Sequence, residues 1–261
     1  MSAFQIQKFQ TSRIATIDVC AMGMEKHHIA AMLEFDVTVS REKIKKYKKD
    51  INKISFTAWL LKVISHTIDE HKQVAAYLKG KQSLIIFEDI NISLAVEKRI
   101  NGQKVPIPLV LEKVNKRSIE SITKSIQSAK DDALTDKDIV LQGQSNALER
   151  FYYKLPGFLR RYFWRYLLKH PHSAFRKMGN VAVTSIGIAG NINGWFIPKS
   201  VHPICFGIGS IIKKPVVREN KIEIREMLNM TVLIDHDVID GVGMARFISD
   251  LSGNIENGFA L

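Results

Sequence analysis

Apolar and polar residues alternate along this chain with two different periods, which predict strands and helices in mixed order. The strand predictions, rich in β-branched and apolar residues, are 28–39, 90–96, 180–187, 204–212 and 221–234. The helix predictions, with apolar side chains at helical spacing, are 40–49, 55–71, 118–129, a segment after Thr135, and 240–256. The first 30 residues show neither period. Strands alternating with helices are typical of an α/β domain.

The chain is long enough for one domain, 1–261, to bury a hydrophobic core without disulfides or metal. Cys20 and Cys205 are its only cysteines, and two isolated cysteines indicate free thiols in a reducing compartment. The N-terminal residues lack the apolar run of a secretory signal, and no apolar run approaches the roughly 20 residues of a membrane span. These features favour a cytoplasmic protein, with the inner face of a membrane as an alternative location.

Charge adds the expectation of an anionic partner. The chain has 38 basic and 26 acidic residues and a formal net charge of +12. A nucleotide-bearing cofactor, an acidic carrier protein, a membrane surface and nucleic acid would each suit this excess. A basic surface without a specific partner would also explain it, because net charge does not identify a site.

Residues 145–178 differ from the rest of the chain because aromatic side chains interleave with basic ones. Pro156 and Gly157 interrupt this segment. The composition suits a helix on an anionic membrane, or a surface for docking a carrier or cofactor. A helical hairpin packed on the core, with its basic residues merely solvated, is an equally plain interpretation. Single-stranded nucleic acid is the least favoured partner, because nothing else in the sequence supports it.

The most informative segment is 232–241, where an apolar strand delivers His236, followed by Asp240 and Gly241. Histidine titrates near working pH, so it can take and return a proton. A histidine at a strand end is more often structural, and spacing alone does not separate these roles. The pattern His-x-x-x-Asp-Gly resembles the active-site motif of chloramphenicol acetyltransferase and of the catalytic domains of 2-oxoacid dehydrogenase acyltransferases.

Other segments follow the order of the latter domains. The similar segments are 12–13, 27–28, 56–68, 89–96, 184–187, 197–198, 203–209 and 214–217. The resemblance covers nearly the whole chain except 145–178. It implies an α+β two-layer sandwich with a mixed sheet, the chloramphenicol acetyltransferase-like fold, and assembly as a homotrimer or a higher multiple.

The resemblance also implies roles for individual residues. His236 would be the general base, and Thr184 the hydroxyl that stabilises the oxyanion, with Ser185 as the alternative donor. In the family, histidine and hydroxyl meet across a subunit interface. Asp240 would form a structural ion pair with Arg13. Gly241 would let the backbone turn tightly toward the following helix.

The expected reaction is direct acyl transfer, without a covalent acyl-enzyme, from a thioester such as acyl-coenzyme A to a thiol, hydroxyl or amine. No tightly bound cofactor and no metal site are expected, since no carboxylate or cysteine completes a ligand set at His27 and His28. Lipoamide on a separate protein is one candidate acceptor. We expect no lipoyl domain ahead of the catalytic segment, an expectation that favours a stand-alone acyltransferase acting on a small-molecule or lipid hydroxyl or amine.

Two residues depart from the family pattern. The family usually has arginine directly after the histidine, where this chain has Asp237, and serine is commoner at the position of Thr184. A carboxylate close to His236 would favour the imidazolium and weaken the base. Asp237 therefore supports an alternative function, a non-catalytic trimeric scaffold derived from an acyltransferase core.

Overall fold

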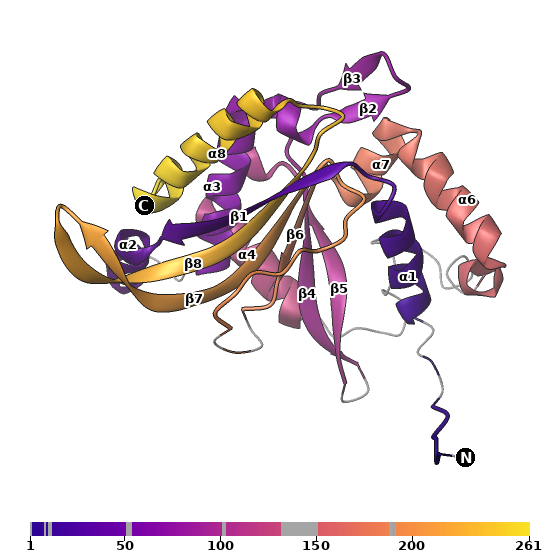
Figure 1. Cartoon of the computed structure of the whole chain (residues 1–261), viewed down its shortest axis with the longest axis horizontal. Helices are drawn as coiled ribbons and strands as arrows, with labels where there is room; N and C mark the ends of the chain where they lie inside the picture. The colour runs from indigo at the N-terminus through magenta and orange to yellow at the C-terminus, as the bar shows by residue number, and fades with distance from the viewer. Residues whose placement is uncertain are drawn as a thin grey trace.

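The computed structural model describes residues 2–7, 9, 12–50, 54–100, 103–131, 151–187, 190 and 192–261. The helix predicted after Thr135 and residues 145–150 of the basic aromatic segment lie outside these ranges. Within them, a six-stranded mixed sheet and a layer of helices on one of its faces form a two-layer structure (Figure 1). The prediction of a two-layer α+β sandwich with a mixed sheet is confirmed.

The sheet has the strand order β1-β8-β7-β6-β4-β5. Its strands are β1 His28–Asp36, β4 Ile92–Ile100, β5 Gln103–Leu111, β6 Val181–Ser185, β7 Ile204–Arg218 and β8 Lys221–Asp235. β6 runs parallel to both β4 and β7, and the other neighbours are antiparallel. β2 (Tyr77–Lys79) and β3 (Ser83–Ile85) form a separate hairpin.

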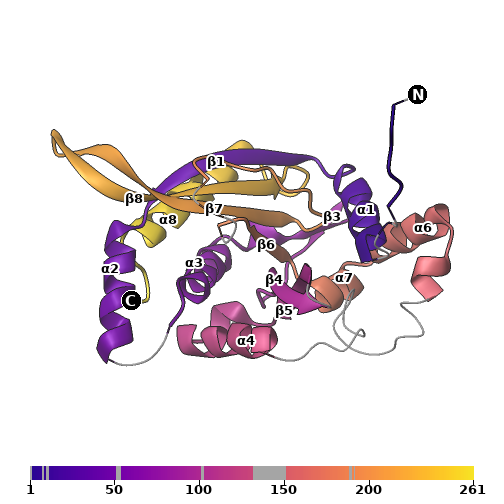
Figure 2. The ribbon, with the colours of Figure 1, turned by 90° about the horizontal axis from the view of Figure 1, so that it is seen from below.

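The helices fall into two groups (Figure 2). The helices packed on the core side of the sheet are α2 Thr38–Asp50, α3 Phe56–Glu70, α4 Ile119–Asp131 and α8 Gly241–Glu256. The helices gathered at one end of the molecule are α1 Ser12–Gly23, α6 Gly157–Leu168 and α7 Pro171–Met178. Two short 3-10 helices, η1 Lys72–Ala75 and η2 Val114–Lys116, complete the described elements. No helix in the described ranges is long and apolar enough to cross a membrane.

The main core lies between the sheet and α3. Ser55 caps α3 by accepting a hydrogen bond from the Ala58 amide at 3.1 Å, as its residue type predicted. Trp59 is fully buried and its indole N–H donates to the Phe259 carbonyl at 2.9 Å. Because β7 and β8 bury one residue in two against this layer, the central strands are rigid supports for whatever follows their ends.

α1 was not predicted, and the reason is Asp18. This carboxylate lies on the buried side of the helix, 1% exposed, where the sequence pattern would need an apolar residue. Its partners come from the basic aromatic segment: Arg160 donates to it at 2.6 Å and the Tyr152 hydroxyl at 2.7 Å. A helix whose buried polar group is satisfied by a distant segment has no amphipathic signature of its own.

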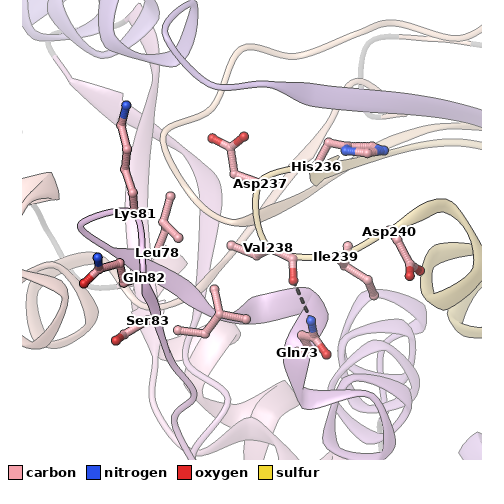
Figure 3. Close-up of a pocket in the computed structure, with 11 residues that line it drawn as sticks. Gln73, Leu78, Lys81, Gln82, Ser83, His236, Asp237, Val238, Ile239 and Asp240 are labelled. Carbon is pink, nitrogen blue, oxygen red and sulfur yellow. Dashed lines mark hydrogen bonds between the residues drawn. The ribbon is translucent and has the colours of Figure 1, made fainter.

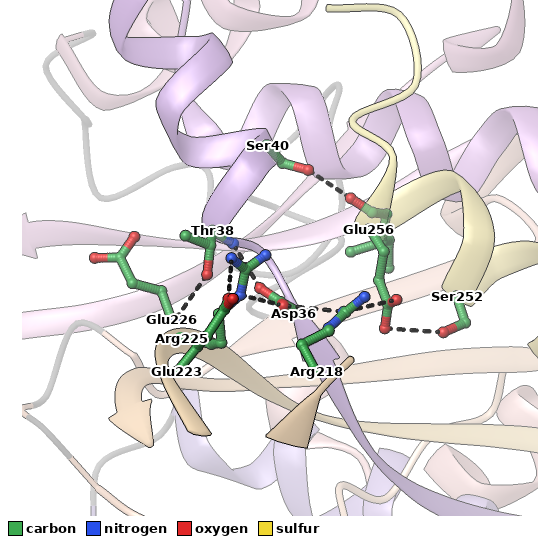
Figure 4. Close-up of polar contacts among 10 residues, drawn as sticks. Asp36, Thr38, Ser40, Arg218, Glu223, Arg225, Glu226, Ser252 and Glu256 are labelled. Atoms are coloured by element: carbon green, nitrogen blue, oxygen red, sulfur yellow. Dashed lines mark hydrogen bonds and ion pairs between the residues drawn. The ribbon is translucent and has the colours of Figure 1, made fainter. Parts of the chain in front are cut away.

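At the opposite end of β1, a second buried carboxylate holds the half of the β7–β8 hairpin nearest its turn (Figure 4). Asp36 accepts hydrogen bonds from Arg225 at 2.7 Å, Arg218 at 3.0 Å and the Thr38 amide at 3.0 Å. Burial alone would raise the pKa of Asp36, but the hydrogen bonds from Thr38 and Arg225 lower it below its ordinary value. The ionised carboxylate therefore ties the start of α2 to β8.

Candidate active site

The turn after β8 presents His236 to solvent from a fixed backbone. The His236 amide donates to the His27 carbonyl at 3.0 Å, and the Val238 amide donates to the Asp235 carbonyl at 3.1 Å. Asp235 and Val238 are buried on either side of the exposed histidine. His236 is thus a reachable titratable side chain on a rigid strand end, the placement that a general base requires.

An open cleft of about 390 Å³ lies beside this turn (Figure 3). One wall is the segment His236 to Asp240, and the other is the β2–β3 hairpin with Lys81 at its turn. The floor mixes apolar and polar side chains, including Leu78, Ile239 and Gln73. Gln73 of η1 donates to the Val238 carbonyl at 2.7 Å and so ties η1 to the segment that carries His236. The cleft gives a small substrate group access to the histidine turn.

A partly buried ion pair supports the turn. The Lys26 ammonium donates to the Asp235 carboxylate at 2.7 Å, and their side chains are 21% and 1% exposed. The same carboxylate accepts a longer hydrogen bond, 3.3 Å, from the Asp237 amide. Because a buried carboxylate without a counter-charge is costly, Lys26 stabilises the backbone that carries His236.

Asp237 is held by another histidine. Both of its carboxylate oxygens lie 3.0 Å from Nδ1 of His27. The hydrogen bond with Asp237 raises the pKa of His27 above its ordinary value. The Asp237 carboxylate, which was the reason for considering a non-catalytic scaffold, therefore contacts the imidazole of His27.

Thr184 lies on the sheet, well away from His236 of the same chain. Val181 and Val183 of β6 point into the core, so Thr184 between them and the strand end faces the other side. Thr184 pairs with Gly207, and Gly207 pairs with Thr231. From Thr231 to His236 the chain advances roughly 17 Å, and two strand spacings add roughly 10 Å sideways. One chain therefore does not bring the predicted base and oxyanion donor together.

The two hydroxyls of β6 differ in their hydrogen bonds. Ser185 accepts from the Gly187 amide at 3.2 Å, so its oxygen already serves the turn after the strand. No described residue hydrogen-bonds to the Thr184 hydroxyl. Thr184, half-buried on the face away from the helices, is the better placed of the two to meet a substrate or a second chain.

The predicted pair of Arg13 with Asp240 does not form within the described chain. Asp240 caps α8 by accepting from the Gly243 amide at 2.8 Å. Arg13 is exposed near the start of α1 and lies over the ring of Phe9, 5.7 Å from its centre. In this chain Asp240 caps a helix and does not pair with Arg13. A capping carboxylate is satisfied by backbone N–H groups and needs no arginine.

The reason predicted for Gly241 is wrong. Its φ lies outside the left-handed region, and a Cβ added there would meet no atom within 4 Å. The backbone therefore turns from His236 into α8 without needing glycine at this position.

A buried histidine that no local sequence pattern marks lies behind the turn. His202 is buried, its Nε2–H donates to the Met178 carbonyl at 2.9 Å, and Nδ1 accepts from the Ser200 hydroxyl at 3.1 Å. Burial lowers the pKa of His202 to about 4, so the ring is neutral. His28 donates from Nε2 to the carbonyl of the same His202 at 2.9 Å. His28 and His202 thus link the start of β1 to the segment before β7, behind the turn that carries His236.

The chain is similar to known proteins over most of its length. A family model described as 2-oxoacid dehydrogenases acyltransferase (catalytic domain) matches residues 5–141 and 175–261. The chain is 26% identical over 240 residues to the lipoamide acyltransferase component of the branched-chain alpha-keto acid dehydrogenase complex of Bacillus subtilis, covering 88% of this chain and 47% of that protein. It is 23% identical over 249 residues to the dihydrolipoyllysine-residue acetyltransferase component of the pyruvate dehydrogenase complex of Mycoplasma pneumoniae, covering 90% and 52%. The chain thus spans about half the length of these relatives.

Solved structures show the same fold. A probable dihydrolipoamide acetyltransferase from Listeria monocytogenes aligns with a TM-score of 0.70 at 19% identity, covering 98% of this chain and 95% of that chain. The cubic core of a pyruvate dehydrogenase multienzyme complex aligns with a TM-score of 0.66 at 16% identity, covering 98% and 92%. A chloramphenicol acetyltransferase aligns with a TM-score of 0.51 at 9% identity, covering 97% and 98%. The predicted chloramphenicol acetyltransferase-like fold is confirmed.

Proposed function

This chain belongs to the 2-oxoacid dehydrogenase acyltransferase (catalytic domain) family, and from that premise we propose that it transfers an acyl group from acyl-coenzyme A to a thiol, hydroxyl or amine acceptor. The observation that carries the proposal is the placement of His236. It lies exposed at the end of a rigid central strand, beside an open cleft, within the family-matched part of the chain.

In the proposed reaction His236 takes the proton of the acceptor as the acceptor attacks the thioester carbonyl. The carbonyl oxygen becomes an oxyanion, which a hydroxyl donor stabilises. When the tetrahedral intermediate collapses, the carbon–sulfur bond breaks and the imidazolium returns its proton to the departing thiolate. The acceptor carries away the acyl group and coenzyme A leaves as the free thiol, so the enzyme needs no covalent intermediate.

Thr184 of a second copy is the proposed oxyanion donor. Within one chain Thr184 and His236 are separated by about five residues along the sheet and two strand spacings. A homotrimer or another closed ring of chains would bring the Thr184 face of one copy to the His236 turn of the next. Met32 on edge strand β1 pairs with Thr231 and so continues this row to the edge of the sheet, where its exposed apolar side chain is available for such a contact.

Coenzyme A suits the charge of the chain. Its phosphates and the +12 formal charge are complementary, and Lys81 stands at the rim of the cleft. The acceptor side is open to a free small molecule, to a lipid, or to a lipoyl group carried by another protein. No resident cofactor is needed for the proposed steps.

The alternative of a non-catalytic scaffold rested on Asp237 lying against His236. The contact of Asp237 with His27 removes that particular argument, and the exposed histidine favours catalysis. An acyltransferase and a non-catalytic scaffold differ in whether removal of His236 lowers acyl transfer.

The test incubates the folded, assembled protein with acetyl-coenzyme A and a panel of thiols, hydroxyls and amines, including dihydrolipoamide, and detects acylated products by mass spectrometry. His236→Ala should lower the transfer rate about 10²–10⁴-fold. His172→Ala, which removes an exposed histidine on α7, is the matched control and should leave the rate unchanged. Equal product from wild type and His236→Ala over the whole panel would overturn the proposal in favour of the scaffold.

A further inference from the structure

Helix α6 carries two apolar faces, and folding explains only one of them. Trp164 and Leu167 pack against Met22 of α1 in the second hydrophobic cluster. On the opposite side, Phe158, Tyr162 and Tyr166 recur every four residues and are 64%, 69% and 54% exposed. Leu159 and Phe163 adjoin them and are 40% and 39% exposed. We call these five residues the aromatic face. A helix at the surface of a domain needs only one apolar stripe.

The surroundings of the aromatic face are basic. The chain from 150 to 178 contains no Asp or Glu, and its eight basic residues are Arg150, Lys154, Arg160, Arg161, Arg165, Lys169, Arg176 and Lys177. Arg160 and Arg165 form ion pairs with Asp18 and Glu25 of the segment around α1, each at 2.6 Å. Arg161 and Lys169 on and after α6 are exposed. Cations therefore border a stripe of exposed rings.

We propose that the aromatic face docks the protein on an anionic lipid surface, with α6 lying in the plane of the headgroups. Tyrosine has an apolar ring and a polar tip, which suits the boundary between acyl chains and headgroups. Basic residues beside it gain from the negative surface potential of anionic lipid. α6 has 12 residues and is too short to cross a bilayer, so it lies on the surface.

The position of α6 allows this contact. The helix lies at the outer edge of the molecule, beyond α1, in both views (Figures 1 and 2). The buried Trp164 and Leu167 and the ion pair of Arg160 with Asp18 mark the inner side of α6, so the aromatic face points away from the body of the protein. The family match leaves out residues 142–174, so the aromatic face lies outside the part of the chain on which the proposed acyl transfer rests.

The test is flotation of the full, assembled chain with vesicles of phosphatidylcholine mixed with phosphatidylglycerol, and with pure phosphatidylcholine vesicles, at low and high salt. Binding to the anionic vesicles at low salt that weakens with salt is the expected result. Arg161→Gln with Lys169→Gln should weaken binding about fivefold for each side chain. The charge-matched control, Lys45→Gln with Lys46→Gln on α2, should bind as wild type does.

A second pair tests the rings themselves. Phe158→Ser with Tyr166→Ser should abolish flotation, whereas Ile222→Ser with Ile224→Ser, which removes exposed apolar residues of β8, should not. Failure of the folded wild type to float overturns the proposal, and leaves docking of an acidic protein as the better explanation. Equal flotation of the ring variant also overturns it. Dissociation of the assembled protein by the ring variant without lipid would overturn it in favour of an interface between copies. None of these readouts depends on acyl transfer.

Discussion

His27 and Asp237 face one another across the start of β1 and the turn after β8, with the imidazole Nδ1 3.0 Å from both carboxylate oxygens. Asp237, which follows His236 in the sequence, thus contacts His27. The hydrogen bond with Asp237 raises the pKa of His27. This pair gives the first prediction.

Replacing Asp237 by Asn should lower the pKa of His27 toward its ordinary value, because the carboxylate that favours the imidazolium is lost. An NMR titration of the histidine ring protons measures it, and Asp237→Glu, which keeps the charge, should preserve most of the shift. Since the folded-state pKa of His27 lies above the unfolded value, its contribution to stability is present below about pH 6.5 and fades as the pH rises through the folded value. An unchanged His27 titration in Asp237→Asn would show that the pair does not exist in solution.

Lys26 should matter for stability more than an ordinary surface lysine. Lys26→Met leaves the Asp235 carboxylate, 1% exposed, without its counter-charge. We expect a loss of about 2–4 kcal/mol in the free energy of unfolding, toward the low end because Lys26 itself is 21% exposed. Urea denaturation of Lys26→Met, Asp235→Asn and the double variant measures the coupling. Additive losses in the double variant would contradict the ion pair.

The sequence pattern predicted what depended on local periodicity and missed what depended on distant partners. α3 was found because its apolar spacing is regular and Ser55 marks its start. α1 was missed because Asp18, on its buried side, is satisfied by Arg160 far along the chain. The motif around His236 predicts this residue, but no sequence pattern predicts the ion pair that stabilises its turn. Lys26 and Asp235 are 209 residues apart in sequence and meet only because β1 pairs with β8. No local pattern could have revealed that pairing.

His202 should make the protein sensitive to mild acid. Its folded-state pKa of about 4 lies below the ordinary value of 6.5, so the unfolded chain takes up the proton first as the pH falls. The stability due to neutral His202 is therefore full above about pH 6.5 and is lost toward pH 4, by about 2 kcal/mol between pH 7 and pH 5. His28, whose pKa burial also lowers, adds in the same direction.

The measurement is the urea midpoint of unfolding at pH 7 and pH 5. His202→Gln should be less stable at pH 7 but should lose less on acidification than wild type does. His172→Gln, which changes an exposed histidine, should keep the wild-type difference. Parallel pH dependence of wild type and His202→Gln would rule out His202 as the source.

Thr231 offers a stabilising substitution. Its hydroxyl is fully buried and has no hydrogen-bond partner in the described structure. Valine has nearly the same shape, so Thr231→Val should leave stability unchanged or raise it by about 1–2 kcal/mol. The control is Thr67, equally buried, whose hydroxyl donates to the Val63 carbonyl and accepts from Asn254 at 3.0 Å each. Thr67→Val should destabilise the protein in the same denaturation experiment. A clear loss in Thr231→Val would indicate a partner for that hydroxyl, such as a buried water.

The separation of Thr184 from His236 leads to a prediction about mixed assemblies. If each site takes His236 from one copy and Thr184 from the next, Thr184→Ala should lower transfer about 10²–10³-fold and His236→Ala about 10²–10⁴-fold, each alone in its own assembly. Unfolding the two variants together and refolding them at equal amounts forms mixed rings. About one quarter of the sites in such rings would combine an intact histidine with an intact threonine, and activity should recover to that level.

A control mixture shows whether recovered activity comes from shared sites and not from the refolding procedure itself. His236→Ala refolded with a Thr184→Ala, His236→Ala double variant contains no intact histidine, and it should stay inactive. If one chain supplied both groups, the first mixture would also stay inactive, because every chain in it lacks one of the two. Recovery in the first mixture alone would therefore place the reaction between copies. Its absence, with mixed rings demonstrated by native mass spectrometry, would rule out Thr184 of a neighbouring chain as the oxyanion donor.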